Sequence, residues 1–427
     1  MYWDEVYSIS VSDRTLSGFL GVLKTDGHGQ APFHTGLWVW LRFSESDWWI
    51  RMFSVLGGTV AIALLFILGS RWLTGRVALA VCAVMLANPF FHRYLIDVRG
   101  YSWLMAIGLG TVLATDNVLR RDRRSDVIWL GLLAGLGIAS QVLFVAVLAS
   151  LALALLISGS LTPTVSRRFS VSIGIGALVV MPVAYPLLNK GASLNQNAPA
   201  TLFRLVRVTS SSLGSLPTSP LVVVGILALL ASTLQRRERN WDTVCVLCLA
   251  IGPAVILTAI SLLGVGEGVY NSRYLMPALP FIALAAVSGY RRMLPAPKDT
   301  TWLFFVTAAF VVTGLFGPSV HDFVQADPVA AATFLNTNVD DEDSVLFEHA
   351  FMQTWVARYW DDRLDVGLLY NSKAADDVQQ GLAVSRSLWL VTLESDPSYL
   401  EELESDRVST TRSFGKLNII ELSSLGD

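Results

Sequence analysis

Residues 54–76 read SVLGGTVAIALLFILGSRWLTGR, an apolar run that ends with two arginines, Arg71 and Arg76. A helix that crosses a membrane needs roughly 20 predominantly apolar residues. The apolar run reaches about this length when the residues from 52 onward are included. Arginine beside the end of a span stays on the cytoplasmic side. The stretch therefore predicts a span over residues 52–70 that runs from the outside to the cytoplasm.

The same pattern recurs along the chain and predicts about ten spans. The chain is 53% hydrophobic and 15% charged, which excludes an ordinary soluble protein. With the N-terminal segment outside, nearly every arginine-rich connector becomes cytoplasmic. The predicted spans cover residues 52–70, 77–92, 101–119, 127–141, 142–158, 170–189, 218–234, 242–264, 275–290 and 300–317. The cytoplasmic connectors carry Arg71, Arg76, Arg120, Arg121, Arg123, Arg124, Arg167, Arg168, Arg236, Arg237, Arg239, Arg291, Arg292 and Lys298.

The region between residues 127 and 158 allows two interpretations. It is a long apolar run without a charge, so it fits one tilted helix as well as two short spans. Two spans that meet at Gly137–Gln141 keep Arg167 and Arg168 in the cytoplasm, whereas one span places them outside. The charge rule favours two.

These spans divide the chain into three parts. Residues 1–51 form a first extracytoplasmic loop, residues 52–317 a transmembrane domain, and residues 318–427 an extracytoplasmic domain. The last part holds 20 acidic and 7 basic residues, a balance of −13, while the remainder has a balance of +10. Topology alone produces such a division, so we expect no nucleic-acid partner. The integral protein is expected in the cell (plasma or inner) membrane.

The C-terminal part alternates between strand and helix patterns. Such alternation predicts a small α/β domain with a parallel sheet. No glycine-rich phosphate motif follows any strand, which argues against a nucleotide site. The predicted strands are 344–347, 366–369, 388–393 and 417–422, and the predicted helices are 330–336, 351–360, 374–384 and 397–405.

Before the first span, residues 13–23 predict a short helix that lies at the membrane interface. Leu16, Phe19, Leu20 and Leu23 fall on one of its faces. The tryptophans between residues 38 and 49 fit an aromatic belt at the outer membrane surface.

The three cysteines, Cys82, Cys245 and Cys248, all lie in predicted spans, so no disulfide framework is expected outside. The Cys245-x-x-Cys248 spacing fits a redox or metal site, but small residues that pack inside an apolar helix are the preferred interpretation. Nothing resembles a zinc site or a Ser-His-Asp triad. No cofactor is predicted with certainty, and a divalent metal at Asp4 or Asp97 stays open.

The outer loops gather carboxylates, guanidinium groups and imidazoles at one membrane boundary. Arginine binds phosphate oxygens through two parallel hydrogen bonds, and a neighbouring carboxylate can deprotonate a hydroxyl. The alternative is that charged groups at span ends only snorkel and pair with one another. The stretches concerned are YWDEVYSIS at 2–10, DGHGQAPFHTGLWVWLR at 26–42, HRY at 92–94, DVRGYSW at 97–103 and RYLMPALP at 273–280.

In order and topology these stretches resemble the polytopic GT-C glycosyltransferases, above all the group of protein O-mannosyltransferases and bacterial aminoarabinose transferases. The resemblance runs across nearly the whole chain. It implies a mainly α, polytopic membrane enzyme with a small extracytoplasmic α/β domain. It also implies transfer of a hexose or pentose from a polyprenyl- or dolichyl-phosphate donor to a hydroxyl of a protein, lipid or glycan, with inversion.

The resemblance also implies roles for individual residues. Asp4 matches the acid of the first loop that is proposed as catalytic base, and Glu5 is its neighbour. Asp97 and Arg99 fall where the family has acidic and basic residues in the second outer loop. Arg273 and Tyr274 fall on the motif near the lipid phosphate. Further candidates are His28, Arg93 and Tyr101.

Two features depart from that family. Its first loop usually carries His-Pro-Pro or a similar run, but Gly29, Gln30 and Ala31 stand here, which leaves the register of His28 ambiguous. Family members also begin with a span before the Asp-Glu loop, so we expect one more span upstream.

Three other functions compete with this hypothesis. A lipid-sugar flippase or transporter predicts inverted repeats and ionisable residues in the middle of spans, whereas the polar groups here gather at the outer boundary. A polysaccharide polymerase or ligase is not expected to have an N-terminal Asp-Glu loop. A membrane anchor needs far fewer than ten spans.

Overall fold

In the computed structural model the chain forms two compact units. One comprises residues 12–321, and the other residues 1–11 with 322–427. The described residues are 3–26, 30–121, 123–190, 213, 218–262, 271–293, 301–316, 327–340, 343–348, 352, 356, 359, 366–368, 387–392, 408–415 and 417–423, with the backbone alone described for some of them.

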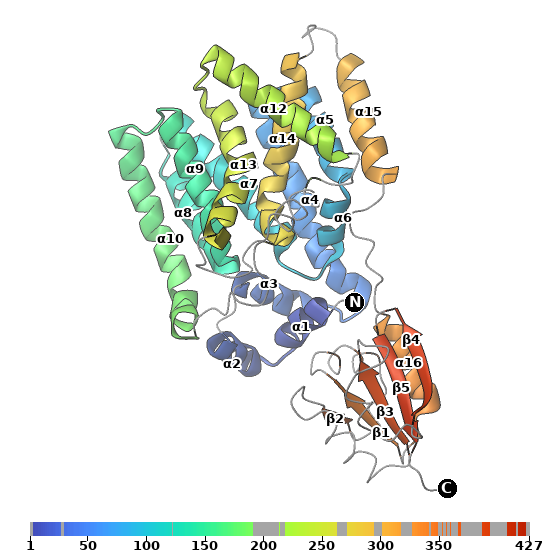
Figure 1. Ribbon diagram of the computed structural model, residues 1–427. Coiled ribbons are helices and arrows are strands. Elements are labelled where there is room, and N and C mark those ends of the chain that lie inside the picture. The colour runs from blue at the N-terminus through green and yellow to red at the C-terminus, as the bar shows by residue number, and fades with distance from the viewer. Residues whose placement is uncertain are drawn as a thin grey trace. The chain divides into compact units, whose positions relative to one another are not determined.

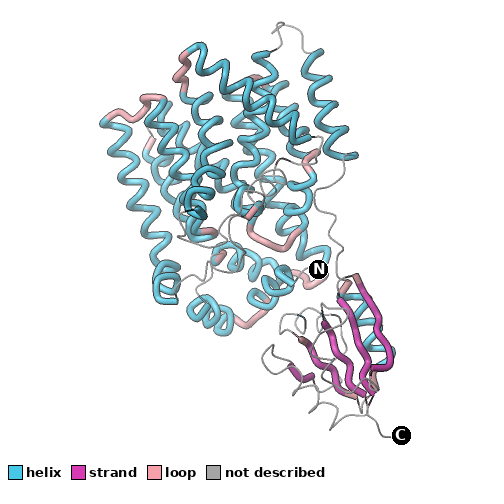
Figure 2. Tube along the Cα trace, viewed as in Figure 1, coloured by secondary structure: helices cyan, strands magenta, loops and turns pink. Residues whose placement is uncertain are grey.

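Helices make up the larger unit (Figures 1 and 2). Each of the ten predicted spans coincides with helix in the structure. The helices are α2 (Leu16–Asp26), α3 (Ala31–Leu41), α4 (Asp47–Trp72), α5 (Gly75–Leu86), α6 (Pro89–Ile96), α7 (Tyr101–Arg120), α8 (Arg124–Ser140), η1 (Val142–Phe144), α9 (Val145–Ile157), α10 (Pro163–Lys190), α12 (Thr218–Arg236), α13 (Trp241–Leu262), η2 (Ser272–Ala278), α14 (Leu279–Met293) and α15 (Thr301–Phe316).

Among the described residues, five helices are long and apolar enough to cross a membrane: α4, α7, the first part of α10, α12 and α13. A sixth crossing results if α5 and α6 count as one bent span. The mostly helical membrane fold is thus confirmed. The remaining predicted spans correspond to helices shorter than 18 residues, so the total of ten crossings stays a prediction.

The bend between α5 and α6 is 70° and follows from the local sequence. Asn88 accepts hydrogen bonds from the N–H groups of Phe90 and Phe91, which caps the start of α6. Pro89 occupies the first turn of α6, where its missing N–H costs nothing. The chain therefore turns before residues 92–100, the second predicted outer loop.

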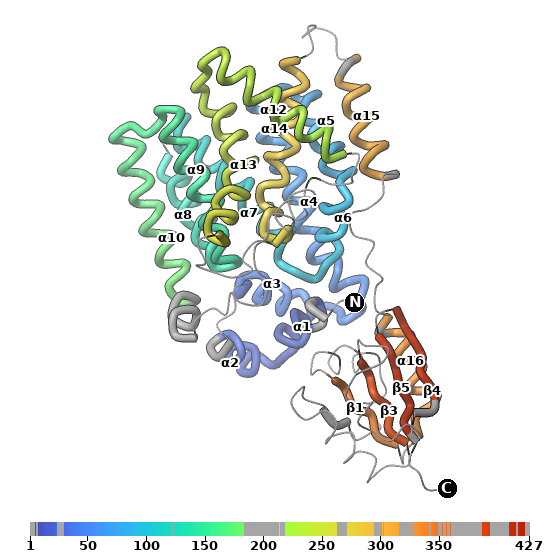
Figure 3. The backbone as a smooth tube through the Cα atoms, in the orientation of Figure 1, coloured from blue at the N-terminus to red at the C-terminus, as the bar shows by residue number. Residues whose placement is uncertain are grey.

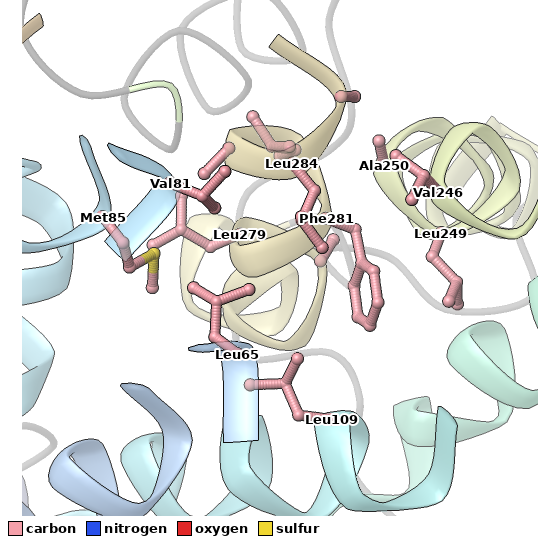
Figure 4. Packing of buried hydrophobic residues seen from close by; sticks show 14 of the residues in the cluster. Leu65, Val81, Met85, Leu109, Val246, Leu249, Ala250, Leu279, Phe281 and Leu284 are labelled. Atoms are coloured by element: carbon pink, nitrogen blue, oxygen red, sulfur yellow. The ribbon is translucent and has the colours of Figure 1, made fainter. Parts of the chain in front are cut away.

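Glycine allows the closest helix contacts of this unit. A side chain at Gly135 would approach the carbonyl oxygen of Gly176 to 2.7 Å, so α8 and α10 meet backbone to backbone. Gly225 and Gly289 bring α12 and α14 together in the same way. Around these contacts the core is apolar. Figure 4 shows Leu65, Val81, Leu109, Leu249 and Phe281, from five different helices, pointing toward one another.

The smaller unit contains most of α1 (Trp3–Ser12), α16 (Pro328–Asn338) and a five-stranded sheet of order β2-β1-β3-β5-β4. Ala331 and Leu335 of α16 share a buried cluster with Val345, Phe347 and Ile419 of the sheet. The strands are β1 (Ser344–Phe347), β2 (Val366–Leu368), β3 (Ser387–Thr392), β4 (Val408–Phe414) and β5 (Leu417–Ser423).

The α/β character of this unit is confirmed, but the expected parallel sheet is wrong. β1 is parallel to β2 and β3, whereas β5 is antiparallel to both β3 and β4. The sequence pattern missed β4, which forms a hairpin with β5 around Gly415 at φ 65°. The predicted helices at 351–360, 374–384 and 397–405 lie almost entirely outside the described residues.

The interfacial segment also differs from its prediction. The helix covers Leu16–Asp26 rather than residues 13–23. Phe19 is buried, while Leu16 and Leu20 are exposed. The apolar residues of α2 are therefore divided: Phe19 packs against the protein, while Leu16 and Leu20 are exposed at its surface.

Candidate active site

The second outer loop has a backbone that neighbouring elements hold in place. Arg51 of α4 donates to the carbonyl oxygen of Ile96 at 2.9 Å, and the Ser54 hydroxyl lies 3.4 Å from the carbonyl oxygen of Arg99. The Gly100 N–H donates to the Gln30 side chain at 3.3 Å. Because Gln30 precedes α3, the first and second outer loops meet at one end of the helical unit (Figure 3).

Gly100 is where α3 comes nearest to this loop. A Cβ atom built on Gly100 would lie 3.1 Å from the Cβ of Phe33. Such a distance is tighter than most real contacts, so a side chain at Gly100 would require Phe33 to shift by a few tenths of an ångström. The glycine is favoured here by this close approach and not by its backbone, since its φ of −70° suits any residue.

Tyr94 marks the point where two distant segments converge. Its ring packs edge-on against Tyr101 with centroids 5.2 Å apart. Arg93 lies 5.8 Å from the centre of the Tyr94 ring, and η2, which carries Arg273, packs against α7. Arg93, Asp97 and Arg273 are all near enough for their charges to act on the Tyr94 hydroxyl. Residues 93–101 and Arg273, far apart in sequence, are therefore brought together.

The Arg-Tyr-Leu-x-Pro motif forms η2, a 3₁₀ segment directly before α14. The Asn271 side chain accepts from the Arg273 N–H at 3.3 Å and so caps the segment. The Arg273 guanidinium lies 5.4 Å from the centre of the Tyr274 ring, and Arg93 lies 5.8 Å from that of Tyr94. Both distances suit cation–π attraction, which orients the two guanidinium groups.

Within the described residues, Arg93, Arg99 and Arg273 share one part of the unit with the Asp97 carboxylate. The Nε–H groups of the three arginines are buried and donate no hydrogen bond, while other polar contacts engage each of these residues. Chemically, several guanidinium groups in one place suit a phosphate group, and Asp97 supplies a carboxylate beside them.

The first-loop candidates belong to the other unit. Asp4 and Glu5 lie on α1. Glu5 is fully buried and has polar interactions, whereas the side chain of Asp4 and the whole of His28 lie outside the described residues. Their catalytic roles therefore stay predictions.

Sequence reasoning missed two buried polar residues of the larger unit. His34 on α3 is buried, with its Nδ1 atom 3.5 Å from the Ser12 hydroxyl. Asp116 on α7 is also buried and pairs with Arg120 at 2.8 Å and with Arg71 at 3.7 Å. The spacing of Asp116 and Arg120, four residues apart on a helix, was the signal that could have revealed this pair.

Within the part of the chain that the structure describes, no three His, Cys, Asp or Glu side chains form a group that could hold a metal ion. Cys82 and Cys245 are buried and Cys248 is partly buried, all as free thiols.

Residues 36–186 match the family described as dolichyl-phosphate-mannose-protein mannosyltransferase. This match covers less than half of the chain and spans α4 to α10 with the second outer loop. No curated protein matches the chain.

Solved structures extend the likeness to nearly the whole chain. ArnT from Cupriavidus metallidurans, bound to undecaprenyl phosphate, superposes with a TM-score of 0.65 at 12% identity, over 98% of this chain and 92% of ArnT. The chain has the fold of ArnT. The same ArnT in its apo state gives a TM-score of 0.62 at 13% identity, over 92% of this chain and 87% of ArnT.

A more distant likeness is the oligosaccharyltransferase AglB of Archaeoglobus fulgidus, in complex with an inhibitory peptide and a dolichol-phosphate. It has a TM-score of 0.50 at 10% identity, over 85% of this chain and 61% of AglB. Together with the family match over residues 36–186, these structures agree with the resemblance read from the loop motifs, and they show the fold of the chain.

Proposed function

We propose that this chain transfers a sugar from a polyprenyl-phosphate donor to a hydroxyl group on the outer face of the membrane, with inversion at the anomeric carbon. The observation that carries the proposal is the convergence of Arg93, Asp97 and Arg273 on Tyr94, beside a loop whose backbone is held by Arg51, Ser54 and Gln30. Three arginines on a fixed frame suit a phosphate at the depth where a lipid headgroup lies.

The structural relatives support the donor class. ArnT was solved with undecaprenyl phosphate and AglB with a dolichol-phosphate. Both ligands are the lipid phosphate that remains when a sugar leaves such a donor. We extend this class of donor to the present chain, with a protein, lipid or glycan as acceptor.

The proposed reaction is a single displacement. Asp4, or its neighbour Glu5, takes the proton of the acceptor hydroxyl as that oxygen attacks the anomeric carbon. The bond between this carbon and the phosphate oxygen breaks, and its electron pair leaves with the lipid phosphate. Arg99 and Arg273 stabilise the negative charge that develops there. Asp97 helps to hold the acceptor or the donor.

The predicted topology supports sugar transfer on the extracytoplasmic side of the membrane. The arginine-rich connectors belong to the opposite end of the spans, so the positive-inside rule favours an extracytoplasmic site. The α/β unit follows α15 and falls on the same side in this topology. We assign it a part in receiving the acceptor.

Transfer in proteoliposomes tests the proposal. The purified chain is mixed with radiolabelled polyprenyl-phosphate sugars and with protein, lipid and glycan acceptors, and the product's anomeric configuration is read by NMR. Transfer with inversion is expected, and it should fall with Arg273→Ala but persist with Arg76→Ala, an exposed arginine of α5. A product of retained configuration, or equal loss in both variants, would contradict the proposal.

A further inference from the structure

A cavity of about 500 Å³ lies between the ends of α4, α12, α13 and α14. Trp72, at the end of α4, lines it, whereas Arg51 near the start of α4 holds the second outer loop. Since α4 has 26 residues, it is roughly 39 Å long. The cavity therefore lies at the opposite end of the helical unit from the candidate active site.

One arginine of this cavity is already engaged by the protein. Arg292 pairs with Glu238 at 2.8 Å and donates to the hydroxyls of Ser232, Thr233 and Thr243 at 3.2, 3.3 and 3.0 Å. These contacts join α14 to α12, to the α12–α13 connector and to α13. Arg292 thus builds the wall of the cavity and has little capacity left for a ligand.

Two other arginines, Arg236 and Arg291, line the same cavity with fewer and longer contacts. Within the described residues, Arg291 forms no hydrogen bond or ion pair, and the nearest carboxylate of Arg236 is Glu238 at 3.8 Å, which already pairs with Arg292. The lining holds three arginines but only two carboxylates, Glu238 and Asp242. The excess charge is positive, and the first turn of α13 adds the N–H groups of a helix start.

Trp72, Leu229, Val246 and Leu284 supply an apolar wall, and Asn240, Thr243 and Ser288 add uncharged polar groups to the lining. A ligand that carries both a phosphate and hydrocarbon finds partners for each in this lining. The predicted topology places this end of the helices at the cytoplasmic headgroup layer, where basic pockets between spans bind anionic lipid headgroups.

We propose that this cavity binds the phosphate of an anionic phospholipid. Arg236 and Arg291 contact the phosphate oxygens, and the glycerol and upper acyl carbons pack against the apolar wall. The assignment rests on this cavity and on the predicted topology, and it does not depend on the sugar or the acceptor of the proposed transfer.

Lipid titration of the purified full-length protein in a neutral detergent tests the assignment. The ligands are phosphatidylglycerol, phosphatidylcholine and inorganic phosphate, and the readouts are the melting temperature and lipid retention in native mass spectrometry. Phosphatidylglycerol should bind best and raise the melting temperature. Arg236→Gln/Arg291→Gln should weaken its binding by at least roughly tenfold, the loss expected for a charge-assisted contact.

The control variant loses the same two positive charges at positions outside the cavity. Arg76→Gln/Arg124→Gln alters two exposed arginines outside the cavity and should bind phosphatidylglycerol like the wild type. Two measurements show whether the variants are folded: the melting temperature in the absence of lipid, and the rate of sugar transfer. Three results would overturn the assignment: equal binding of phosphatidylcholine, protection by inorganic phosphate in place of the lipid, or undiminished phosphatidylglycerol binding by the cavity variant.

Discussion

The two polar ends of the helical unit use arginine in different ways. At the end near the last turn of α4, Arg71 and Arg120 pair with Asp116 and Arg292 pairs with Glu238, while Arg236 and Arg291 line the cavity. At the other end, side chains of neighbouring elements hold the backbone of the second outer loop. Arg51 and Ser54 contact carbonyl oxygens of residues 96 and 99, and Gln30 accepts from Gly100.

This difference separates a structural from a functional use of the same residue type. Side chains that are saturated by protein partners stabilise the packing of helices. A loop whose backbone is fixed presents its side chains in a set geometry, which is what a binding or catalytic site needs. The comparison predicts that substitutions at the outer end change transfer, while those at Asp116 change stability.

The largest effect is expected for Asp4→Asn. The change removes the proposed proton acceptor with almost no change in volume, and loss of a positioned base costs about 10²–10⁴-fold in rate. Donor binding should survive because Arg99 and Arg273 are the proposed phosphate contacts. Transfer rate and donor affinity are measured side by side in proteoliposomes.

Asp13→Asn is the matched control for Asp4→Asn. Asp13 is exposed, and its ion pair with Arg42 is long at 4.0 Å, so its loss should matter little. Near-normal transfer by well-expressed Asp4→Asn would remove Asp4 from the mechanism and direct the search to Glu5 and Asp97.

Arg273→Ala should have the next largest effect. It removes charge-assisted hydrogen bonds to the lipid phosphate, which are worth about 1.5–3 kcal/mol, so transfer should fall by roughly 10–100-fold. Unlike Asp4→Asn, it should also weaken donor binding. A lower turnover with unchanged donor affinity would show that Arg273 acts on the transition state alone.

Asp116→Ala tests the structural end of the comparison. Asp116 also accepts a hydrogen bond from Trp72 at 3.2 Å. Because Arg71 and Arg120 reach solvent, with 32% and 55% of their side chains exposed, the cost is reduced to about 1–3 kcal/mol. The melting temperature should fall by a few degrees, while transfer per folded molecule stays normal. Lost transfer at unchanged melting temperature would overturn the structural role.

Much of the fold follows from the sequence because apolar length is a strong signal in membranes. Every predicted span coincides with helix in the structure. The sequence did not predict β4 (Val408–Phe414), because this segment reads VSTTRSF and is largely polar. It lies at the edge of the sheet, and its described residues are mostly exposed. An edge strand of this kind has no alternation of buried and exposed residues to detect.

The candidate site is predictable only in part. Motif order placed Arg93, Asp97 and Arg273 among the candidates, and the structure brings these three around Tyr94. The role of Gln30 was not foreseen, since only the fold reveals that its amide oxygen reaches the Gly100 N–H, 70 residues away. Tyr94 lies in the HRY stretch at 92–94 but was not predicted as a site residue. Its position depends on the 70° bend before α6, which the sequence did not reveal.

The smallest effect is expected for Gln30→Ala, which tests whether the backbone contact matters for transfer. Gln30 has a φ of 127°, and alanine keeps the Cβ atom, so the backbone strain is similar in both proteins. The change removes one acceptor, worth about 0.5–1.5 kcal/mol. If the outer loop must be held in place for donor binding, KM should rise by a few-fold with little change in kcat. Gln235→Ala, at an exposed position on α12, is the control and should leave both constants unchanged. A fall in melting temperature equal to that of Asp116→Ala, with KM unaltered, would show that Gln30 only stabilises the fold and that the two ends of the unit do not differ as argued.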